Sequence, residues 1–187
     1  MTTTDRHADL APSQWVERHA HLVFPAARVL DVGAGHGRHA LFFAARGASV
    51  LAIDRDAGAL ATFAHAPGVT TRAADLEVAP WPLAGETFDA IVVVHYLHRP
   101  LWRHLIAALA PDGVLLYETF AAGNEQFGRP TNPDFLLQAG ELLDVVRGQL
   151  TVVAFEQGLT RRAARPAVVQ RIAAVGPARA WPPPLDA

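Results

Sequence analysis

The sequence predicts a single α/β domain with a mostly parallel sheet and helices on both faces. Three observations lead to this fold class. Residues 28–46 have the pattern of a strand, a glycine-rich turn and a helix, and residues 88–94 form the almost continuous apolar run of a central strand buried on both faces. The last two apolar segments, 150–155 and 167–175, are too close together to be joined by a crossover helix. A chain of 187 residues is long enough for one such domain with one substantial core.

The segment 28–46 organises the rest of the chain. Its apolar start is short and rich in β-branched residues, which favours a strand, and the alanines and leucine at 40–45 recur at helical spacing. Between them lie Gly33, Gly35 and Gly37 at alternate positions. Such a turn lets the backbone approach a ligand closely and points the N–H groups of a helix N-terminus at it.

The spacing of the glycines distinguishes between two kinds of ligand. A dinucleotide fingerprint, Gly-x-Gly-x-x-Gly, would need its third glycine at position 38, which is Arg38. An acidic residue, Asp31, also lies inside the strand, where a nicotinamide-binding strand normally carries an apolar one. The pattern Asp31-x-Gly33-x-Gly35-x-Gly37 resembles motif I of the class I S-adenosylmethionine (SAM) methyltransferases. The alternative is a glycine-rich turn without a ligand.

Composition excludes several classes of function. The net charge of −2 gives no electrostatic footprint for nucleic acid or for an anionic membrane, and all sixteen basic residues are arginine. Because the chain has no cysteine, it cannot form a disulfide, a thiolate nucleophile or a cysteine-ligated zinc site. With no signal peptide and no apolar run of membrane-spanning length, we expect a cytoplasmic soluble protein.

The methyltransferase-like domain is expected at 13–176, between a flexible N-terminus at 1–12 and a proline-rich tail at 177–187 that is extended or disordered. Ser13 is the predicted N-cap of the first helix. That helix either carries Trp15 and Arg18 towards the ligand as a lid or only covers the sheet.

Asp54 directly follows the second predicted strand, 49–53. A carboxylate in this place can accept hydrogen bonds from the ribose hydroxyls of an adenosine. Because NAD enzymes use the same arrangement, Asp54 supports an adenosine-containing ligand without choosing between cofactors. An ordinary turn residue at a strand end is the alternative.

The segment between the second and fourth predicted strands contains one regular helix and the third strand. Asp56 is the predicted N-cap of a helix over 57–64, and residues 69–74 form the third strand. Pro80 and Pro82 preclude a regular helix after it.

The loop after the fourth strand, 88–94, contains His95, Tyr96 and His98. Ligands of open α/β sheets bind beyond the carboxyl ends of the strands, so this loop should face the reacting group. Because an imidazole titrates near neutrality, His95 is a candidate general base or substrate contact, with Tyr96 as a second candidate catalytic residue. Two histidines without an acidic neighbour do not make a metal site, and the alternative for His98 and Arg99 is the start of the next helix.

The second half of the domain continues with a helix at 102–109, a turn at 110–113 and the fifth strand at 114–117. A long loop at 120–135 follows, and loops of this length in compact domains are usually lids or binding loops. It contains Phe127 and Arg129 as candidate substrate contacts.

Three more elements complete the prediction. Asn132 and Pro133 are the N-cap and first residue of a short helix into 135–137, and a second helix covers 141–146. Strands 150–155 and 167–175 form an antiparallel hairpin whose solvated tip carries Arg161, Arg162 and Arg165. A nicotinamide-binding Rossmann domain generally does not end in such a hairpin.

Nearly the whole chain resembles the small class I SAM methyltransferases often labelled tellurite-resistance-type. The segments that carry the resemblance are PSQWVERHA, RVLDVGAGHGRHALFFAARG, VLAIDRD, VVVHYLHRPLW and LLYETFAAGNEQFGRPTNPDFLLQAGELL. The resemblance implies a Rossmann-like, seven-stranded sheet of order 3-2-1-4-5-7-6 with the last strand antiparallel. It also implies SAM at the switch point between strands 1 and 4, with S-adenosylhomocysteine (SAH) as the product.

The resemblance also implies roles for individual residues. In this class an acidic residue at the position of Asp75 takes the adenine amino group, and the next backbone N–H, of Leu76, meets the ring. The residues expected at the cofactor are Asp31, Gly33, Ala34, Gly35, Gly37, Arg38, Asp54, Arg55, Asp75, Leu76 and His95. Those expected at the substrate are Trp15, Arg18, Phe127 and Arg129.

The predicted function is in-line methyl transfer from SAM to a small molecule. An oxyanion or chalcogenide acceptor needs no general base, whereas a phenol or an amine does. Two alternatives stay open: a SAM-binding regulatory or partner protein without catalysis, and a NAD(P)-binding oxidoreductase, which the glycine spacing and the final hairpin disfavour.

Overall fold

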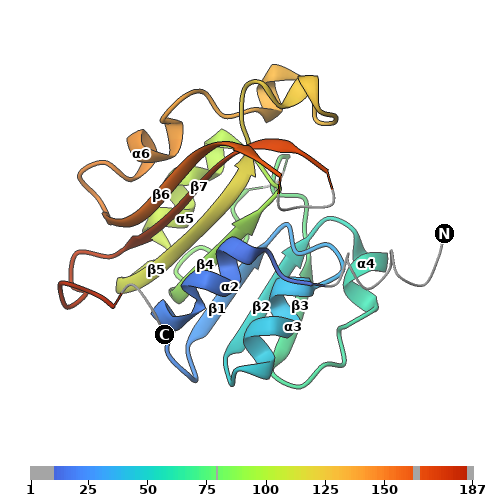
Figure 1. Cartoon of the computed structure of the whole chain (residues 1–187). Helices are drawn as coiled ribbons and strands as arrows, with labels where there is room; N and C mark the ends of the chain where they lie inside the picture. The colour runs from blue at the N-terminus through green and yellow to red at the C-terminus, as the bar shows by residue number, and fades with distance from the viewer. Residues whose placement is uncertain (1–10, 79, 162–164, 185–187) are drawn as a thin grey trace.

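The computed structural model describes residues 11–78, 80–161 and 165–184. Seven strands form one sheet of order β3-β2-β1-β4-β5-β7-β6 (Figure 1), so the predicted fold class and strand order are confirmed. The strands are β1 (Arg28–Val32), β2 (Ser49–Asp54), β3 (Val69–Ala73), β4 (Phe88–Val94), β5 (Leu109–Phe120), β6 (Thr151–Thr160) and β7 (Ala167–Val175).

The strand directions follow from the lengths of the connections. Five neighbouring strands of the sheet pair in parallel, in the order β3, β2, β1, β4 and β5. In contrast, β7 runs antiparallel to both β5 and β6. A parallel connection needs a dozen or more residues, which the short β6–β7 connection does not supply. The predicted hairpin is therefore confirmed.

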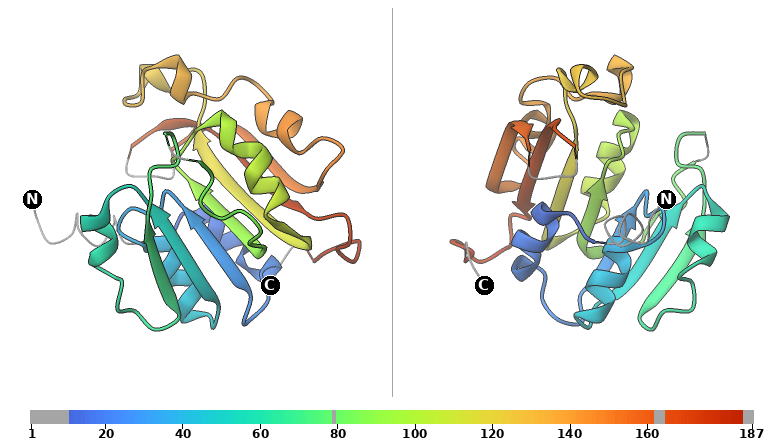
Figure 2. Two further views of the ribbon diagram at one scale, coloured as in Figure 1. Left: turned by 180° about the vertical axis from the view of Figure 1, so that it is seen from behind. Right: turned by 45° about the vertical axis from the view of Figure 1, so that its right-hand side comes forward.

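Short helices cover both faces of the sheet, with α2 and α3 on one side and α5 and α6 on the other (Figure 2). The α-helices are α2 (Gln14–His19), α3 (Arg38–Ala45), α4 (Ala57–Ala61), α5 (Trp102–Ala107) and α6 (Glu141–Val146). The 3₁₀ turns are η1 (Ala20–Leu22), η2 (Arg99–Leu101), η3 (Asn124–Gln126) and η4 (Pro133–Phe135). No helix in these described ranges is long and apolar enough to cross a membrane.

Alternate residues of each central strand belong to two separate cores. In β4, Ala90 and Val92 pack with α2 and α3, whereas Ile91 and Val93 pack with α5 and α6. Because successive strand side chains point to opposite faces, a strand covered on both sides must be apolar at every position. This explains the unbroken apolar run of β4.

Several predicted boundaries are wrong, among them the end of the helix predicted at 102–109, since α5 ends at Ala107 and Leu109 already belongs to β5. Residues 110–113 form no separate turn but a bulge inside β5, since Phe88 pairs with Leu109 and Ala90 already pairs with Val114. The helix predicted to reach residue 64 ends at Ala61, and β6 extends past residue 155 to Thr160.

The two ends of the described chain pack against each other. Ser13 caps α2 as predicted, because its side chain accepts a hydrogen bond from the N–H of Trp15. The start of the tail contacts the first part of the chain: Arg179 donates to the carbonyl of Leu22 at 2.6 Å, and a ring nitrogen of His21 lies 3.1 Å from the carbonyl of Pro184. The flexibility predicted for the first ten residues falls outside the described ranges.

Candidate functional site

The glycine turn connects β1 to α3 and is fastened to β2. Gly33, Gly35 and Gly37 have φ angles of 68°, 52° and 78°, a conformation that L side chains rarely adopt. The N–H groups of Gly33 and Ala34 both donate to the carbonyl of Ile53, at 2.9 and 3.1 Å. The turn is thereby held at the carboxyl ends of two neighbouring strands, where ligands of open α/β sheets bind.

The three glycines leave different amounts of space. A Cβ added to Gly37 would lie 2.6 Å from the ring of Phe63, and one added to Gly33 would lie 3.1 Å from Tyr96. A Cβ added to Gly35 would meet nothing within 4 Å. Gly33 and Gly37 therefore accommodate aromatic residues of the protein itself, and Gly35 alone has open space beside it.

Asp31 links β1 to the first turn of α3, on either side of the glycine turn. Its buried carboxylate accepts a 3.0 Å hydrogen bond from the N–H of Ala40, in the first turn of α3. Burial raises the pKa of this carboxyl group to about 7. Asp31 is not among the residues that line the neighbouring pocket, and its hydrogen bond positions α3; the cofactor contact stays a prediction.

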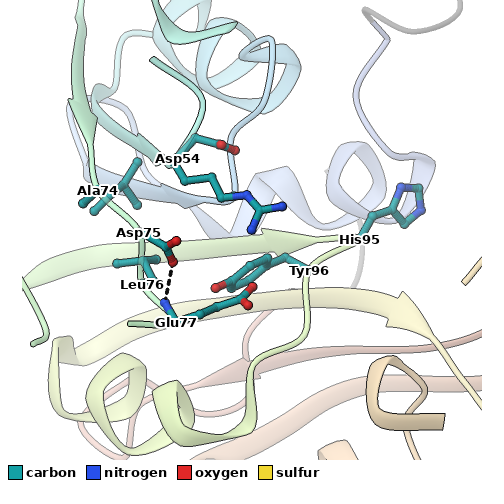
Figure 3. A pocket seen from close by; sticks show the side chains of 10 residues that line it. Asp54, Ala74, Asp75, Leu76, Glu77, His95 and Tyr96 are labelled. Atoms are coloured by element: carbon teal, nitrogen blue, oxygen red, sulfur yellow. Dashed lines mark hydrogen bonds between the residues drawn. The ribbon is translucent and has the colours of Figure 1, made fainter. Parts of the chain in front are cut away.

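Asp54 holds the turn from the side of β2. One oxygen of its carboxylate accepts from the N–H of Gly35 at 2.8 Å, and the other accepts from the N–H of Asp56 at 2.9 Å. It borders a pocket of about 230 Å³ (Figure 3). The pocket is lined by Gly33, Ile53, Asp54, Arg55, Ala74, Asp75, Leu76, Glu77, His95 and Tyr96.

Six of the residues predicted at the cofactor thus come together in this pocket, which we call the cofactor pocket after that prediction. They are Gly33, Asp54, Arg55, Asp75, Leu76 and His95. Four others do not line it, namely Ala34, Gly35 and Gly37 in the turn and Arg38 at the start of α3.

Glu77 is a pocket residue that sequence reasoning missed. A carboxylate oxygen of Asp75 accepts a 2.9 Å hydrogen bond from the N–H of Glu77, drawn as a dashed line in Figure 3. Aspartate side chains commonly bond to the backbone two residues on, and this turns the chain. The Asp-x-Glu order after a predicted strand was the signal that could have identified it.

His95 and Tyr96 project in opposite directions at the end of β4 (Figure 3). His95 has a φ of 59°, unusual for a residue with a side chain, and its N–H donates to the carbonyl of Glu118 at 2.9 Å. Its ring stacks on Phe120 with centroids 4.7 Å apart. This sharp backbone turn sends Tyr96 towards the cofactor pocket and the imidazole towards β5.

The imidazole of His95 is poorly suited to act as a general base. A guanidinium nitrogen of Arg38 lies 3.4 Å from Nδ1, and because arginine only donates, the proton of the ring belongs on Nε2. Burial and then the positive charge of Arg38 lower the pKa of His95 to about 4. The near-neutral titration that suggested a base is therefore wrong, and the ring is a neutral hydrogen-bond donor at pH 7.

A second pocket, of about 620 Å³, lies on the other side of His95. Phe127 and Arg129, both predicted at the substrate, line it together with Glu118, Phe120 and Arg165, which sequence reasoning missed. His95 lines both pockets, which makes them neighbours. We call this second cavity the acceptor pocket.

The loop that carries Phe127 and Arg129 is anchored to the sheet. Asn124 is buried, and its side-chain oxygen accepts a 3.1 Å hydrogen bond from the N–H of Val168 in β7. The predicted binding loop therefore has one fixed point close to the acceptor pocket.

The structure does not bring Trp15 or Arg18 to either of these pockets, which corrects the lid hypothesis. Trp15 is 1% exposed, and its indole N–H donates to the carbonyl of Ile172 at 3.2 Å. Arg18 forms an ion pair with Glu156. Because the Trp15 ring is buried in the core and its N–H is already bonded, the side chain has no free surface for a ligand. The helix α2 therefore covers the sheet and does not act as a lid.

Comparisons with known proteins agree with this architecture. Residues 29–113 match the family model described as a methyltransferase domain, whereas a comparison with curated proteins gave no match. TehB from Haemophilus influenzae superposes with a TM-score of 0.74 at 18% identity, covering 88% of this chain and 62% of that one. An S-adenosylmethionine-dependent methyltransferase from Mesorhizobium loti gives 0.64 at 20% identity, covering 83% and 94%.

A third structure contains bound ligands. It is 1,6-didemethyltoxoflavin-N1-methyltransferase from Burkholderia thailandensis with 1,6-didemethyltoxoflavin and S-adenosylhomocysteine, with a TM-score of 0.62 at 23% identity, covering 93% of this chain and 78% of that one. Residues 29–113 thus match a methyltransferase domain, and the whole chain has the fold of these SAM-dependent methyltransferase structures, in agreement with the resemblance seen in the sequence. The chain spans 62% of the length of TehB.

Proposed function

We propose that the protein transfers a methyl group from SAM to a small molecule. The observation that carries the proposal is Asp54, whose carboxylate is fixed by two backbone N–H groups beside the glycine turn. From that place it would accept hydrogen bonds from the ribose hydroxyls of SAM. Asp75 and Leu76 in the same pocket would receive the adenine.

In SAM the methyl group is bonded to a positively charged sulfur. The neutral thioether that remains after transfer is a good leaving group. The chain's own residues then have to hold the acceptor in line and exclude water, and alignment of this kind is worth about 7–11 kcal/mol. The stacked rings of His95 and Phe120 form a rigid wall shared with the acceptor pocket. Through its Nε2 proton, His95 would donate a hydrogen bond that orients the acceptor.

Neither candidate catalytic residue supplies strong basicity near pH 7. His95 is neutral with a lowered pKa. Burial, followed by the negative charge of Glu77, raises the pKa of Tyr96 above that of an ordinary tyrosine, so its phenol keeps its proton. The proposed mechanism therefore uses an acceptor that arrives as a nucleophile, such as an anion or a soft chalcogen.

Calorimetry with SAM, SAH and NADH tests the function. We expect SAM and SAH to bind at 1:1 and NADH not to bind. The Asp54→Ala variant should bind SAM about 10- to 150-fold more weakly, equivalent to about 1.5–3 kcal/mol for a lost charged hydrogen-bond partner.

Asp56→Ala is the matched control for Asp54→Ala. Asp56 caps α4 by accepting from the N–H of Ala59 at 3.0 Å, so its loss affects a neighbouring helix and not the ligand. If both variants bind SAM equally well, the ribose assignment is wrong. Tight NADH binding without SAM binding would identify an oxidoreductase, and SAM binding without methyl transfer to any acceptor would favour a non-catalytic role.

A further inference from the structure

The partners of the arginine side chains divide them into two groups. Outside the two pockets, most arginines are neutralised: Arg18, Arg28, Arg72, Arg99, Arg147 and Arg171 form ion pairs with acidic side chains. Three more have other partners, since Arg103 and Arg179 donate hydrogen bonds and Arg46 lies over the ring of Phe42. Arg38 lies against His95.

Four arginines have no ion pair or hydrogen bond within the ranges 11–78, 80–161 and 165–184, and every one of them borders a cavity. Arg55 lines the cofactor pocket, and Arg129 and Arg165 line the acceptor pocket. Arg161 lines a groove of about 750 Å³ that shares Thr160 and Val169 with the acceptor pocket. Six of the ten other arginines in these ranges have an acidic partner, so the placement of these four at cavities indicates that a ligand supplies the missing negative charge.

Arg129 and Arg165 reach the acceptor pocket from separate parts of the chain. Arg129 belongs to the loop after β5, and Arg165 lies just before β7. The same pocket also holds the carboxylate of Glu118, but this charge already has partners. It accepts a 2.6 Å hydrogen bond from the hydroxyl of Ser13, and a nitrogen of Arg171 lies 3.9 Å away. The uncompensated charge of the pocket is therefore positive.

The acceptor pocket also contains apolar surface, contributed by Phe120, Phe127 and Val169. Phe127, which lines this cavity, is 40% exposed. A volume of about 620 Å³ lies within the range of roughly 300–1,000 Å³ typical of sites for drug-sized ligands. This space and this apolar lining exceed what a bare inorganic anion requires.

We propose that the methyl acceptor is a small organic acid with a ring or a similarly sized apolar part. Its apolar part packs against Phe120 and Phe127, and its carboxylate, sulfonate or phosphate binds Arg129 and Arg165. Arginine suits this task because its planar guanidinium can bind an oxyanion through two parallel hydrogen bonds. The inference deepens the proposed function, on which it depends, by naming the substrate class.

Matched pairs of probes test the proposal by calorimetry in the presence of SAH. The pairs are 4-hydroxybenzoate with phenol and 4-aminobenzoate with aniline, each differing only in the carboxylate. We expect at least one acid to bind tenfold or more tightly than its neutral partner. Arg129→Ala and Arg165→Ala should each reduce that preference at least fivefold, and the double variant should abolish it.

Arg147→Ala is the matched control, because Arg147 is an exposed arginine paired with Asp144 in α6. It should keep the full preference for the acid, and all variants should bind SAH within twofold of the wild type. The proposal is overturned if no acid binds more tightly than its neutral partner, or if Arg147→Ala lowers the preference as much as Arg129→Ala does. Absence of SAH binding by the wild type would instead show that the proposed function has failed.

Discussion

The hydroxyl of Ser13 donates a 2.6 Å hydrogen bond to Oε2 of Glu118, a residue of β5 that lines the acceptor pocket. The N–H of Ser13 donates to Nε2 of the buried His39 in α3 at 3.1 Å, and its hydroxyl oxygen accepts from the N–H of Trp15 at 3.1 Å. One residue thus joins the first turn of α2, the first turn of α3 and the wall of the acceptor pocket. The N-terminal helix supports the site in this way, although Trp15 itself contacts no ligand surface.

Replacing Ser13 by alanine should therefore destabilise the fold. The variant loses a helix cap and leaves the buried carboxylate of Glu118 without its hydroxyl partner, at an expected cost of about 1–3 kcal/mol in the free energy of unfolding. Urea denaturation measures this cost, and Ser13→Thr, which keeps the hydroxyl, should recover most of it. Ser49→Ala, at an exposed strand start, is the control. Equal stability of the two alanine variants would show that the bond to Glu118 contributes nothing.

A comparison of two glycines with almost the same φ angle distinguishes the cost of backbone strain from the cost of a steric clash. Gly37 and Gly85 have φ angles of 78° and 79°, but an added Cβ meets the Phe63 ring at 2.6 Å in the first case and open space in the second. Gly85→Ala should cost about 1–2 kcal/mol, the usual strain of the left-handed conformation. Gly37→Ala should cost clearly more, because the ring must move as well.

Urea denaturation measures both costs, and a Phe63→Ala background tests whether the Phe63 ring causes the extra cost of Gly37→Ala. In that background the added methyl group has space, so Gly37→Ala should cost about as much as Gly85→Ala does. If the extra cost of Gly37→Ala persists without the ring, the explanation by packing is wrong.

Local patterns predicted the elements whose signal lies within the element itself. The bounds of β4, α6 and β7 agree with the prediction because apolar period and length suffice to define them. The turn predicted at 110–113 failed for the opposite reason. Its proline, aspartate and glycine are strong local turn formers, but pairing with β4 on both sides absorbs them into β5 as a bulge.

The same distinction applies to the site. Asp54 was predictable, because the ends of neighbouring parallel strands must meet at one edge of the sheet, and the family resemblance added Asp75 and Leu76. Arg165 and Glu118 were not predictable, since they reach the acceptor pocket only through the pairing of β5 with β7. Trp15 could not be assigned from the sequence either, because an indole in an amphipathic helix suits a core and a binding site equally well.

Asp54→Ala should also change the stability of the unliganded protein. A ligand-binding carboxylate alone would leave the unliganded fold unaffected. In the structure the carboxylate holds the N–H of Gly35 and of Asp56, so we expect a loss of about 1–3 kcal/mol in the free energy of unfolding without ligand. Asp54→Asn, which keeps one acceptor oxygen, should lose less. Urea unfolding without ligand in which Asp54→Ala matches the wild type would contradict the assigned hydrogen bonds.

Asp31 should impose a pH dependence on stability. Burial raises the pKa of its carboxyl group from 3.8 to about 7, so between these values the folded state binds a proton that the unfolded state releases. The stability contributed by this group is present below pH 4 and is lost as the pH rises through 7, on the order of 1 kcal/mol per pH unit at most. Asp31→Asn removes the titration and keeps an oxygen for the N–H of Ala40.

Urea denaturation from pH 5 to pH 8 should thus show Asp31→Asn gaining on the wild type as the pH rises. Asp112→Asn, at an exposed position in β5, should follow the wild type throughout. Parallel curves for the wild type and Asp31→Asn would mean that the carboxyl group titrates alike in the folded and unfolded chain.

His39 should impose the opposite dependence, because it is the neutral acceptor for the N–H of Ser13. Burial, followed by the positive charges of Arg38 and His95, lowers its pKa from 6.5 to about 3. Between these values the unfolded chain binds a proton that the folded chain excludes, so stability falls as the pH drops below 6.5, on the order of 1 kcal/mol per pH unit at most. His39→Gln retains an acceptor without titrating and should flatten the urea-unfolding curve between pH 4 and pH 6.5. His65→Gln, at an exposed position, should leave the curve unchanged, and if the two variants behave alike, acid does not act through the link between His39 and Ser13.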